Sequence, residues 1–450
     1  MKKNEYGIFT AIAMIVGIVI GSGIFFKSDN ILISTGGSIS LGVLVFCIAA
    51  IAIIFGSLTI SELASRNSEA GGVISYAEKS YNKSVACGFG WFQTFLYFPT
   101  LIAVVAWVAA IYICMLFNIE GTLTTQILIG LAVTVVLFIS NTLSAKLGGY
   151  FQNGSTIIKL IPLIFIAIIG LMYGDVSEVS FKEITAMQSV GWITAIAPIA
   201  FSFDGWIVAT SIGHEIKDSK RNLPKALIFA PIFILLIYVV YFIGICTYIG
   251  PEQVIALGDG HVDLIANNIL GPFGAKIMMI FVIISVMGTI NGLILGLIRL
   301  PYSLAIRDMF PNSKKISIVN EKLNMPVNSA IIGFILCLFW TAVHYITTNY
   351  GLLPNSDISE ISICISYVLY ILLYVRVFRY GLSGEIKGIW RGKINPILAI
   401  LGSLIILSGS IGNQLFWVYA GICSLVIISA MLYWKNRSSK LEKLDTVKSA

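Results

Sequence analysis

Apolar stretches of about 20 residues recur along almost the whole chain, with short polar segments between them. Folded as a helix, a stretch of that length crosses the apolar core of a bilayer. The chain is therefore expected to be an all-α polytopic membrane protein with a single transporter domain over residues 1–450. The pattern predicts twelve transmembrane helices, centred near residues 20, 50, 100, 134, 163, 201, 237, 288, 338, 369, 403 and 424.

Two of these stretches are interrupted near their middles. The first stretch, roughly residues 8–34, contains Gly21-Ser22-Gly23-Ile24-Phe25, and the sixth contains Phe201-Ser202-Phe203-Asp204-Gly205-Trp206. A broken helix exposes backbone N–H and C=O groups that lipid cannot pair, so the break must line a cavity or meet a ligand. Taken alone, the first break is equally compatible with close helix packing, which the pattern Gly17-x-x-x-Gly21 favours.

The spacing of the two breaks predicts an inverted repeat. They lie five spans apart, and because five is odd, spans 1 and 6 cross the membrane in opposite directions. The expected five-plus-five repeats cover about residues 7–173 and 190–379, followed by two helices at about 395–435 and a short cytoplasmic tail at 436–450. Matching breaks in two inverted halves predict a substrate site near the middle of the membrane.

Composition and charge agree with a multi-pass membrane protein. Hydrophobic residues make up 57% of the chain and charged residues 11%. With both termini placed in the cytoplasm, Lys27, Lys182 and Lys276 fall outside, Lys159 falls within a span, and the other 25 of the 29 Lys and Arg residues are cytoplasmic. The net charge of +7 therefore reflects how the chain is oriented in the plasma membrane, with its positive residues on the cytoplasmic side. It does not indicate a nucleic acid partner.

The cysteines do not indicate a metal site or a disulfide-linked partner. Six of the seven lie in or at the ends of apolar stretches, without paired metal-ligand spacing: Cys47, Cys114, Cys246, Cys337, Cys364 and Cys423. The predicted external loop at residues 117–125 contains no cysteine, so no disulfide-linked accessory subunit is expected. We expect no cofactor and no metal.

Other classes of membrane protein fit the sequence poorly. The spans contain no H-E-x-x-H motif, no paired mid-membrane aspartates and no Ser/His dyad at a shared depth, which argues against an enzyme. A channel would need a polar stripe along several helices, whereas the polar residues gather at the two breaks.

Three motifs occur in an order that resembles a known family. They are the stretch from Gly17 to Phe25, the stretch from Phe201 to Trp206, and Arg221-Asn222-Leu223-Pro224. The chain resembles the amino acid/polyamine/organocation (APC) superfamily over roughly residues 7–435. Within it, the chain is most similar to the L-type amino acid transporter (LAT) family and its bacterial serine/threonine and alanine-serine-cysteine exchangers.

The resemblance implies a LeuT-type fold with discontinuous helices 1 and 6. It also implies sodium-independent transport of neutral L-amino acids by alternating access, most simply obligate exchange, with small substrates such as Ala, Ser, Thr and Cys favoured. The partners expected are therefore the amino acid substrate and membrane lipid.

A broken helix can hold both ends of an amino acid, because free N–H groups attract the carboxylate and free carbonyls attract the ammonium. The resemblance assigns the carboxylate to the backbone of Gly21, Ser22 and Gly23. It assigns the ammonium to carbonyls near Val19, Ser22, Phe201 and Asp204. Ser202, which follows Phe201, is also expected to contact the substrate. Phe201 corresponds to an aromatic gate that closes over the substrate.

Asp204 has two interpretations, since its carboxylate can cap the second half of span 6 or act on substrate or protons.

Lys159 is the only Lys or Arg placed within a span. So close to the cytoplasmic end of its helix, it can extend its ammonium toward water. The resemblance instead places this lysine near the break in helix 1, where sodium-coupled members of the fold bind sodium. A fixed ammonium there would replace the ion. If burial lets the lysine release its proton, the alternative is a proton-coupled amino acid or amine symporter that uses Lys159.

Two further polar residues are predicted at the site. The resemblance implies that Asn291, in span 8, helps to line the pocket, although a hydrogen bond between helices is an equal alternative. In span 7, Tyr238 can reach the substrate or helix 1 through its hydroxyl. Tyr241 lies near it on the same helix, and the sequence does not choose between them.

Overall fold

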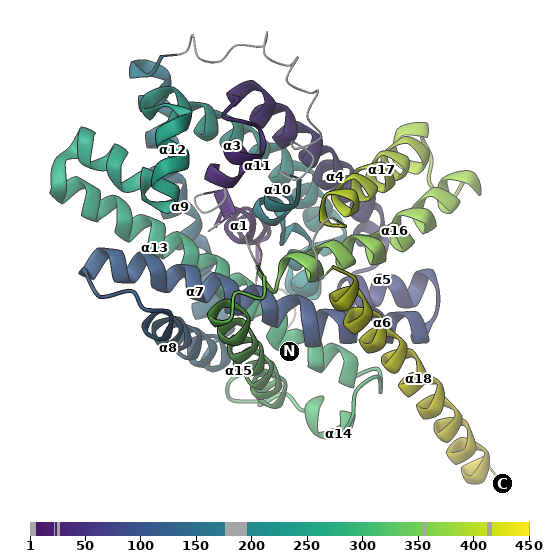
Figure 1. Cartoon of the computed structure of the whole chain (residues 1–450). Coiled ribbons are helices and arrows are strands. Elements are labelled where there is room, and N and C mark those ends of the chain that lie inside the picture. Colours follow the sequence, from purple (N-terminus) through teal and green to yellow (C-terminus); the bar gives the residue numbers. More distant parts are fainter. Residues whose placement is uncertain are drawn as a thin grey trace.

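The computed structural model describes residues 6–21, 23–24, 28–175, 196–353, 357–411 and 416–449 (Figure 1). This described part is helical, and its only β contacts are isolated bridges between Tyr6 and Ile216 and between Asn320 and Met325. The sequence prediction of an all-α protein is therefore confirmed.

The first half of the chain, up to the undescribed residues 176–195, runs from α1 to α9. Its elements are α1 (Ile8–Val19), α3 (Ser28–Ser34), α4 (Ile39–Arg66), α5 (Val73–Ser80), α6 (Lys83–Phe92), the π-helical η1 (Gln93–Tyr97), α7 (Phe98–Phe117), α8 (Leu123–Leu143) and α9 (Ala145–Tyr173).

The second half begins with α10. Its elements are α10 (Ile196–Phe203), the 3₁₀ helix η5 (Trp206–Glu215), α11 (Ser219–Ile249), α12 (Pro251–Leu257), η6 (Gly258–Gly260), α13 (His261–Ala305), α14 (Ser313–Ile316), α15 (Val327–Asn349), α16 (Glu360–Leu382), η7 (Trp390–Ile394), α17 (Asn395–Ser410) and α18 (Phe416–Ser449).

Among the described residues, ten helices are long and apolar enough to cross a membrane. They account for ten of the predicted spans. The other two are the interrupted ones: α1 has 12 residues, and the sixth span is divided into α10 and η5. The total of twelve spans and the limits of the two repeats stay predictions.

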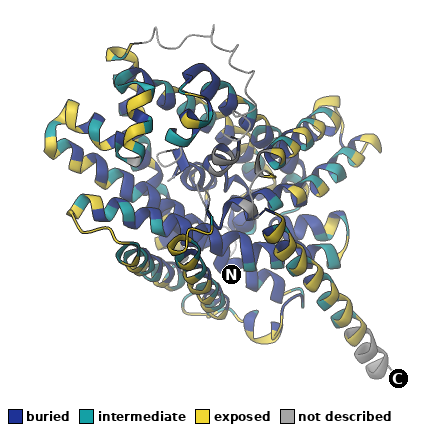
Figure 2. Cartoon of the chain, in the orientation of Figure 1, coloured by how far each residue is buried: buried dark blue, intermediate teal, exposed yellow. Residues whose placement is uncertain are grey.

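The short helix α1 lies at the centre of the molecule, where α9, α11, α13 and η5 pack against it (Figure 1). Figure 2 shows buried residues gathered around this centre and exposed residues along α8, α15 and α18. Many of those exposed residues are large and apolar, such as Leu128 and Ile139 on α8 and Leu425 on α18. Large apolar side chains on the outside of the molecule are expected where helices face lipid.

Candidate functional site

Helix α1 stops where its glycines predict. The last helical residue is Val19, and Ile20 adopts extended backbone angles (φ −74°, ψ 93°). The last four carbonyls of any α-helix have no partner within the helix. In α1 these belong to residues 17–20, which are fully or almost fully buried, so other groups must pair with them.

Lys159 of α9 supplies donors to two of these carbonyls. Its ammonium donates to the Gly17 carbonyl at 2.5 Å and to the Ile20 carbonyl, and Thr289 Oγ1 lies 3.5 Å from Nζ. The side chain is completely buried, and no carboxylate lies within ion-pair distance among the described residues. The negative end of the α1 dipole and the two carbonyls therefore stabilise the buried cation in place of an acidic residue.

Tyr238 and Thr289 supply the remaining donors. The Tyr238 hydroxyl lies 2.7 Å from the Val19 carbonyl and 2.8 Å from the Ser202 carbonyl, in the second break. Thr289 Oγ1 lies 3.3 Å from the carbonyls of both Gly17 and Ile18. Side chains from α9, α11 and α13 thus place donors within hydrogen-bond distance of all four terminal carbonyls of α1. Tyr241, the other candidate on α11, lies 3.3 Å from His261 Nε2 instead.

The two breaks contact each other directly. Ser202 Oγ donates to the Gly23 carbonyl at 3.0 Å. A Cβ atom at Gly23 would lie 2.6 Å from Ser202 Cα, closer than any side chain tolerates. Gly205 has a φ of 94°, and a Cβ there would lie 2.4 Å from a methyl of Ile18. Glycine is needed at both positions because the backbones approach so closely.

Asp204 is buried between the second break and α7. Its Oδ2 accepts a hydrogen bond of 2.5 Å from the Tyr97 hydroxyl. The N-cap of η5 is Gly205, which makes no side-chain cap bond. The Asp204 carboxyl thus bonds to a phenol of the π-helical segment η1, and it also accepts a hydrogen bond from the backbone N–H of Gly205 at the start of η5. The second bond is of the kind that the capping interpretation predicts. Asp204 also lines the central cavity, so it can meet a ligand there.

The central cavity lies between the two breaks and is small. Its volume is about 20 Å³. That space holds about one water molecule and no amino acid. The walls include backbone of both breaks and apolar side chains of α7 and α13: Ile18, Val19, Gly21, Gly23, Leu101, Val105, Asp204, Gly205, Thr289 and Leu293. The structure is therefore a contracted conformation, and the helices must separate for a ligand to bind.

Asn291 is engaged away from this cavity. Its Nδ2 donates to the Gly148 carbonyl at 3.1 Å and to Gln152 Oε1 at 3.0 Å, and its Oδ1 accepts from Asn141 Nδ2 at 2.8 Å. The amide thus connects α13 to α8 and α9, which corresponds to the helix-packing alternative. Ser22 and the side chain of Phe201 lie outside the described residues.

Sequence reasoning missed several contributors. Thr289, Tyr97 and the walls Leu101, Val105 and Leu293 were not predicted. Thr289 carried a signal, because it is a polar residue two positions before Asn291 in an apolar helix. Tyr97 carried none, since it is one of 19 tyrosines and nothing local relates it to Asp204.

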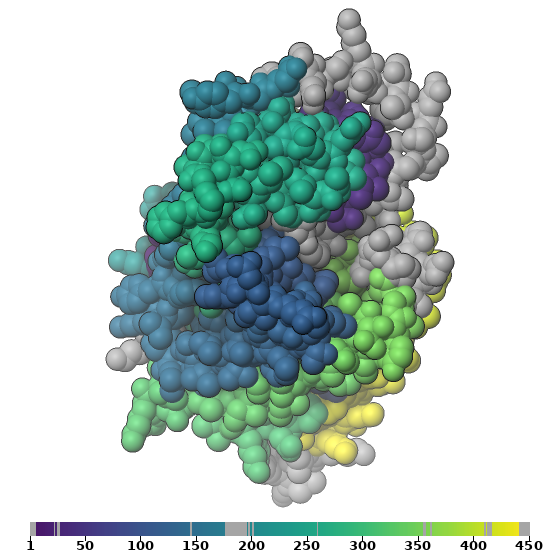
Figure 3. Space-filling model, turned by 60° about the vertical axis from the view of Figure 1, so that its left-hand side comes forward, coloured from purple at the N-terminus to yellow at the C-terminus, as the bar shows by residue number. Residues whose placement is uncertain are grey.

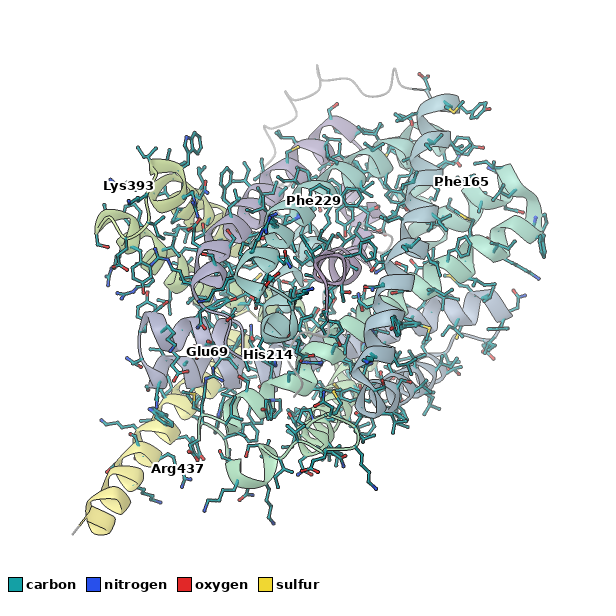
Figure 4. The ribbon with its side chains drawn as sticks, turned by 180° about the vertical axis from the view of Figure 1, so that it is seen from behind. Glu69, Phe165, His214, Phe229, Lys393 and Arg437 are labelled. Carbon is teal, nitrogen blue, oxygen red and sulfur yellow. The ribbon has the colours of Figure 1, made fainter. Side chains whose placement is uncertain are left out.

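A second cluster connects the start of α1 to the end of η5. Tyr6 forms a parallel bridge with that segment, through its N–H to the Glu215 carbonyl at 3.1 Å and its carbonyl to the Lys217 N–H at 2.8 Å. The buried Glu215 carboxylate accepts from Arg299 Nε at 2.5 Å and Nη2 at 2.9 Å. Figure 4 marks the region through His214, the neighbour of Glu215. We call Tyr6, Glu215, Lys217 and Arg299 the latch.

The family of the protein follows from comparison of the whole chain with known proteins. The family model described as amino acid permease matches residues 6–434. The chain belongs to the amino acid permease family. As a member of this family, which lies in the APC superfamily, it is a multi-pass membrane transporter, and the predicted resemblance is confirmed.

Curated relatives of this permease match it along most of their length. It is 28% identical over 417 residues to the serine/threonine exchanger SteT of Bacillus subtilis (strain 168), covering 91% of each chain. It is 27% identical to the human b(0,+)-type amino acid transporter 1, covering 96% of this chain and 87% of the relative. It is 24% identical to the human Asc-type amino acid transporter 1, covering 86% and 74%. These relatives are transporters and not enzymes.

A solved structure supports the fold of the permease. The crystal structure of MhsT in complex with L-phenylalanine superimposes with a TM-score of 0.60, covering 96% of this chain and 99% of MhsT. At 15% sequence identity this likeness concerns the fold alone, which is LeuT-like.

Proposed function

We propose that the protein exchanges small neutral L-amino acids across the plasma membrane, independently of sodium, by alternating access. The observation that carries this proposal is the set of donors that Lys159, Tyr238 and Thr289 direct at the four terminal α1 carbonyls, in which one Tyr238 hydroxyl serves two carbonyls. The names of the relatives, a serine/threonine exchanger and an Asc-type transporter among them, agree with this substrate class.

Tyr238 leaves a place for the ammonium of an amino acid. Its hydroxyl has one proton but lies within hydrogen-bond distance of two carbonyls, those of Val19 and Ser202. At any moment one of the two carbonyls lacks a donor. A substrate ammonium beside Val19 supplies that donor, while the substrate carboxylate binds the backbone N–H groups of Gly21, Ser22 and Gly23 at the start of the next helical segment.

Lys159 supports independence from sodium. A bound cation would neutralise the partial negative charge at the end of α1, and the Lys159 ammonium already does so through the Gly17 and Ile20 carbonyls. Sodium would have to compete with a tethered cation that uses the same oxygens. The transport cycle then has no need of an ion gradient, which favours exchange.

The latch supports alternating access. It joins Tyr6, two residues before α1, to the end of η5, and through Arg299 to α13, so both broken segments are held together at one end. We propose that this end faces the cytoplasm with both chain termini, because the charge asymmetry of the sequence favours that orientation. We propose that substrate release inward requires the latch to separate, and that the Phe201 side chain forms the gate on the other side.

A second candidate function rests on Lys159. Its ammonium is completely buried and has no carboxylate partner among the described residues, which makes Lys159 the candidate carrier of a transported proton. If the proton leaves during the cycle, the protein is a proton-coupled amino acid or amine symporter. The two functions predict different driving forces.

Counterflow in proteoliposomes separates them. We expect radiolabelled L-serine to enter vesicles preloaded with unlabelled L-serine and not empty vesicles, with equal rates in sodium and potassium buffers. The measurement is uptake by purified protein, with and without a pH gradient. Uptake into empty vesicles driven by an inward proton gradient would replace exchange by symport, and absence of uptake under every condition would contradict the substrate class.

Tyr238→Phe tests the proposed ammonium position. The substitution removes the hydroxyl that serves the Val19 and Ser202 carbonyls, and an unpaired buried carbonyl costs about 1–3 kcal/mol. We expect the KM for serine to rise about tenfold. Tyr241→Phe is the matched control, because it removes a buried hydroxyl of the same helix that faces His261. Equal KM values in the two variants would contradict the assignment.

A further inference from the structure

A second and much larger cavity lies between α7 and α13, at the end of these helices away from the latch. Its volume is about 440 Å³, within the range of small-molecule sites. Figure 3 shows a recess between the surface of α13 (teal to green) and that of α7 and α8 (blue). We call it the outer cavity. The residues that matter here are Met115, Asn118, Asp263, Asn267, Lys276 and Met279.

The kink in α13 brings two opposite charges to this cavity. Asp263 and Lys276 are 13 residues apart, which is about 20 Å in a straight helix. Gly271, with φ 68° and ψ −179°, breaks the helix between them, and Pro272 follows. Both charged residues consequently line the same cavity. A positive φ favours glycine, so the sequence supports the kink.

Neither charged side chain is satisfied by the protein. Among the described residues, Asp263 and Lys276 make no ion pair and no side-chain hydrogen bond, and the amides of Asn118 and Asn267 are also unpaired. All four residues are exposed. The outer cavity therefore offers one free carboxylate, one free ammonium and two free amides to a molecule from solution.

These groups match an amino acid in its zwitterionic form. We propose that the outer cavity binds α-amino acids from the external solution, with Lys276 pairing with the substrate carboxylate and Asp263 with the substrate ammonium. The proposal rests on the proposed function, which makes amino acids the transported species. Because the charges are exposed to water, binding is weak, in the millimolar range.

The outer and central cavities share the same two helices. On α7, Met115 lines the outer cavity and Val105 the central one; on α13, the corresponding residues are Met279 and Thr289. Each pair is ten residues apart, about 15 Å of helix. An amino acid in the outer cavity is thus held about 15 Å from the transport site, along the same two helices.

The double variant Asp263→Asn with Lys276→Gln tests the outer cavity without changing the net charge. We expect the KM for external serine to rise about threefold to tenfold, while the KM for internal serine and the maximal rate stay unchanged. The measurement is exchange in vesicles of defined orientation. Glu120→Gln, in the exposed loop after α7, is the control for removal of a nearby acid. Unchanged external KM in the double variant would overturn the proposal.

Binding stoichiometry separates this proposal from the proposed function. We expect two molecules of labelled L-serine per protein at millimolar concentration, and one in either the double variant or Gly23→Val. Serinamide and N-acetylserine, which each lack one charge, should not displace the outer molecule. Suppose instead that the wild type binds one serine, which is lost in Gly23→Val and retained in the double variant. That result would overturn the outer site alone. Absence of serine binding to the wild type would overturn both.

Discussion

A Lys159→Met variant is expected to lose amino acid exchange by about 100-fold or more while remaining folded in the membrane. The substitution removes the ammonium that donates to the Gly17 and Ile20 carbonyls. It leaves the buried Ile20 carbonyl without a donor, and it leaves the Gly17 carbonyl with only the Thr289 hydroxyl at 3.3 Å. Each unpaired carbonyl costs about 1–3 kcal/mol, and every 1.4 kcal/mol is a factor of about ten in a rate or affinity. Counterflow of labelled serine measures the loss.

Lys146→Met is the matched control for this variant. Lys146 belongs to the same helix, α9, but is exposed, so its replacement should leave exchange unchanged. Size-exclusion chromatography of both proteins distinguishes lost transport from lost folding. Exchange at the wild-type rate in folded Lys159→Met would contradict the role of the ammonium. Loss of proton-driven uptake alone, with exchange intact, would favour the symporter.

A Gly23→Val variant is expected to abolish substrate binding at the central site. Any Cβ at this position would lie 2.6 Å from Ser202 Cα, which is backbone and cannot rotate away. Overpacking of this kind costs about 1–3 kcal/mol, and it acts on the contact that joins the two breaks. We expect uptake to fall below detection, with the folded protein still present in the membrane.

Gly421→Val provides the comparison for Gly23→Val. Gly421 lies in α18, and a Cβ there would meet no atom within 4 Å. The same added volume should therefore have no effect on uptake. The thermal shift caused by serine reports binding directly: it should be present in Gly421→Val and absent from Gly23→Val. Unchanged uptake by Gly23→Val would contradict the placement of the substrate site at the two breaks.

Local features of the sequence were enough to predict the fold class and both breaks. An apolar stretch long enough to cross a bilayer is visible within about 20 residues, and so is a glycine-rich interruption of it. Helix α1 ends at Val19 and α10 ends at Phe203, at the predicted interruptions. The family was also predictable, because its motifs are short and ordered along the chain.

The partners of these breaks depended on packing between distant helices. Lys159 is 142 residues from Gly17, Tyr238 is 219 residues from Val19, and Thr289 is 271 residues from Ile18. Asn291 and Thr289 are two residues apart, and α13 turns one toward α9 and the other toward α1. The resemblance favoured Asn291 for the site, but helix rotation decides which side chain meets the cavity.

The sequence by itself therefore determined that this is a helical membrane transporter with two broken helices, since length, apolarity and helix-breaking residues act within one segment. Only the tertiary structure decided which side chains pair with the freed carbonyls of α1, that Asp204 bonds to Tyr97, and that Glu215 meets Arg299. The physical reason is that buried polar groups must find partners, and the nearest ones come from helices whose mutual packing no local pattern encodes.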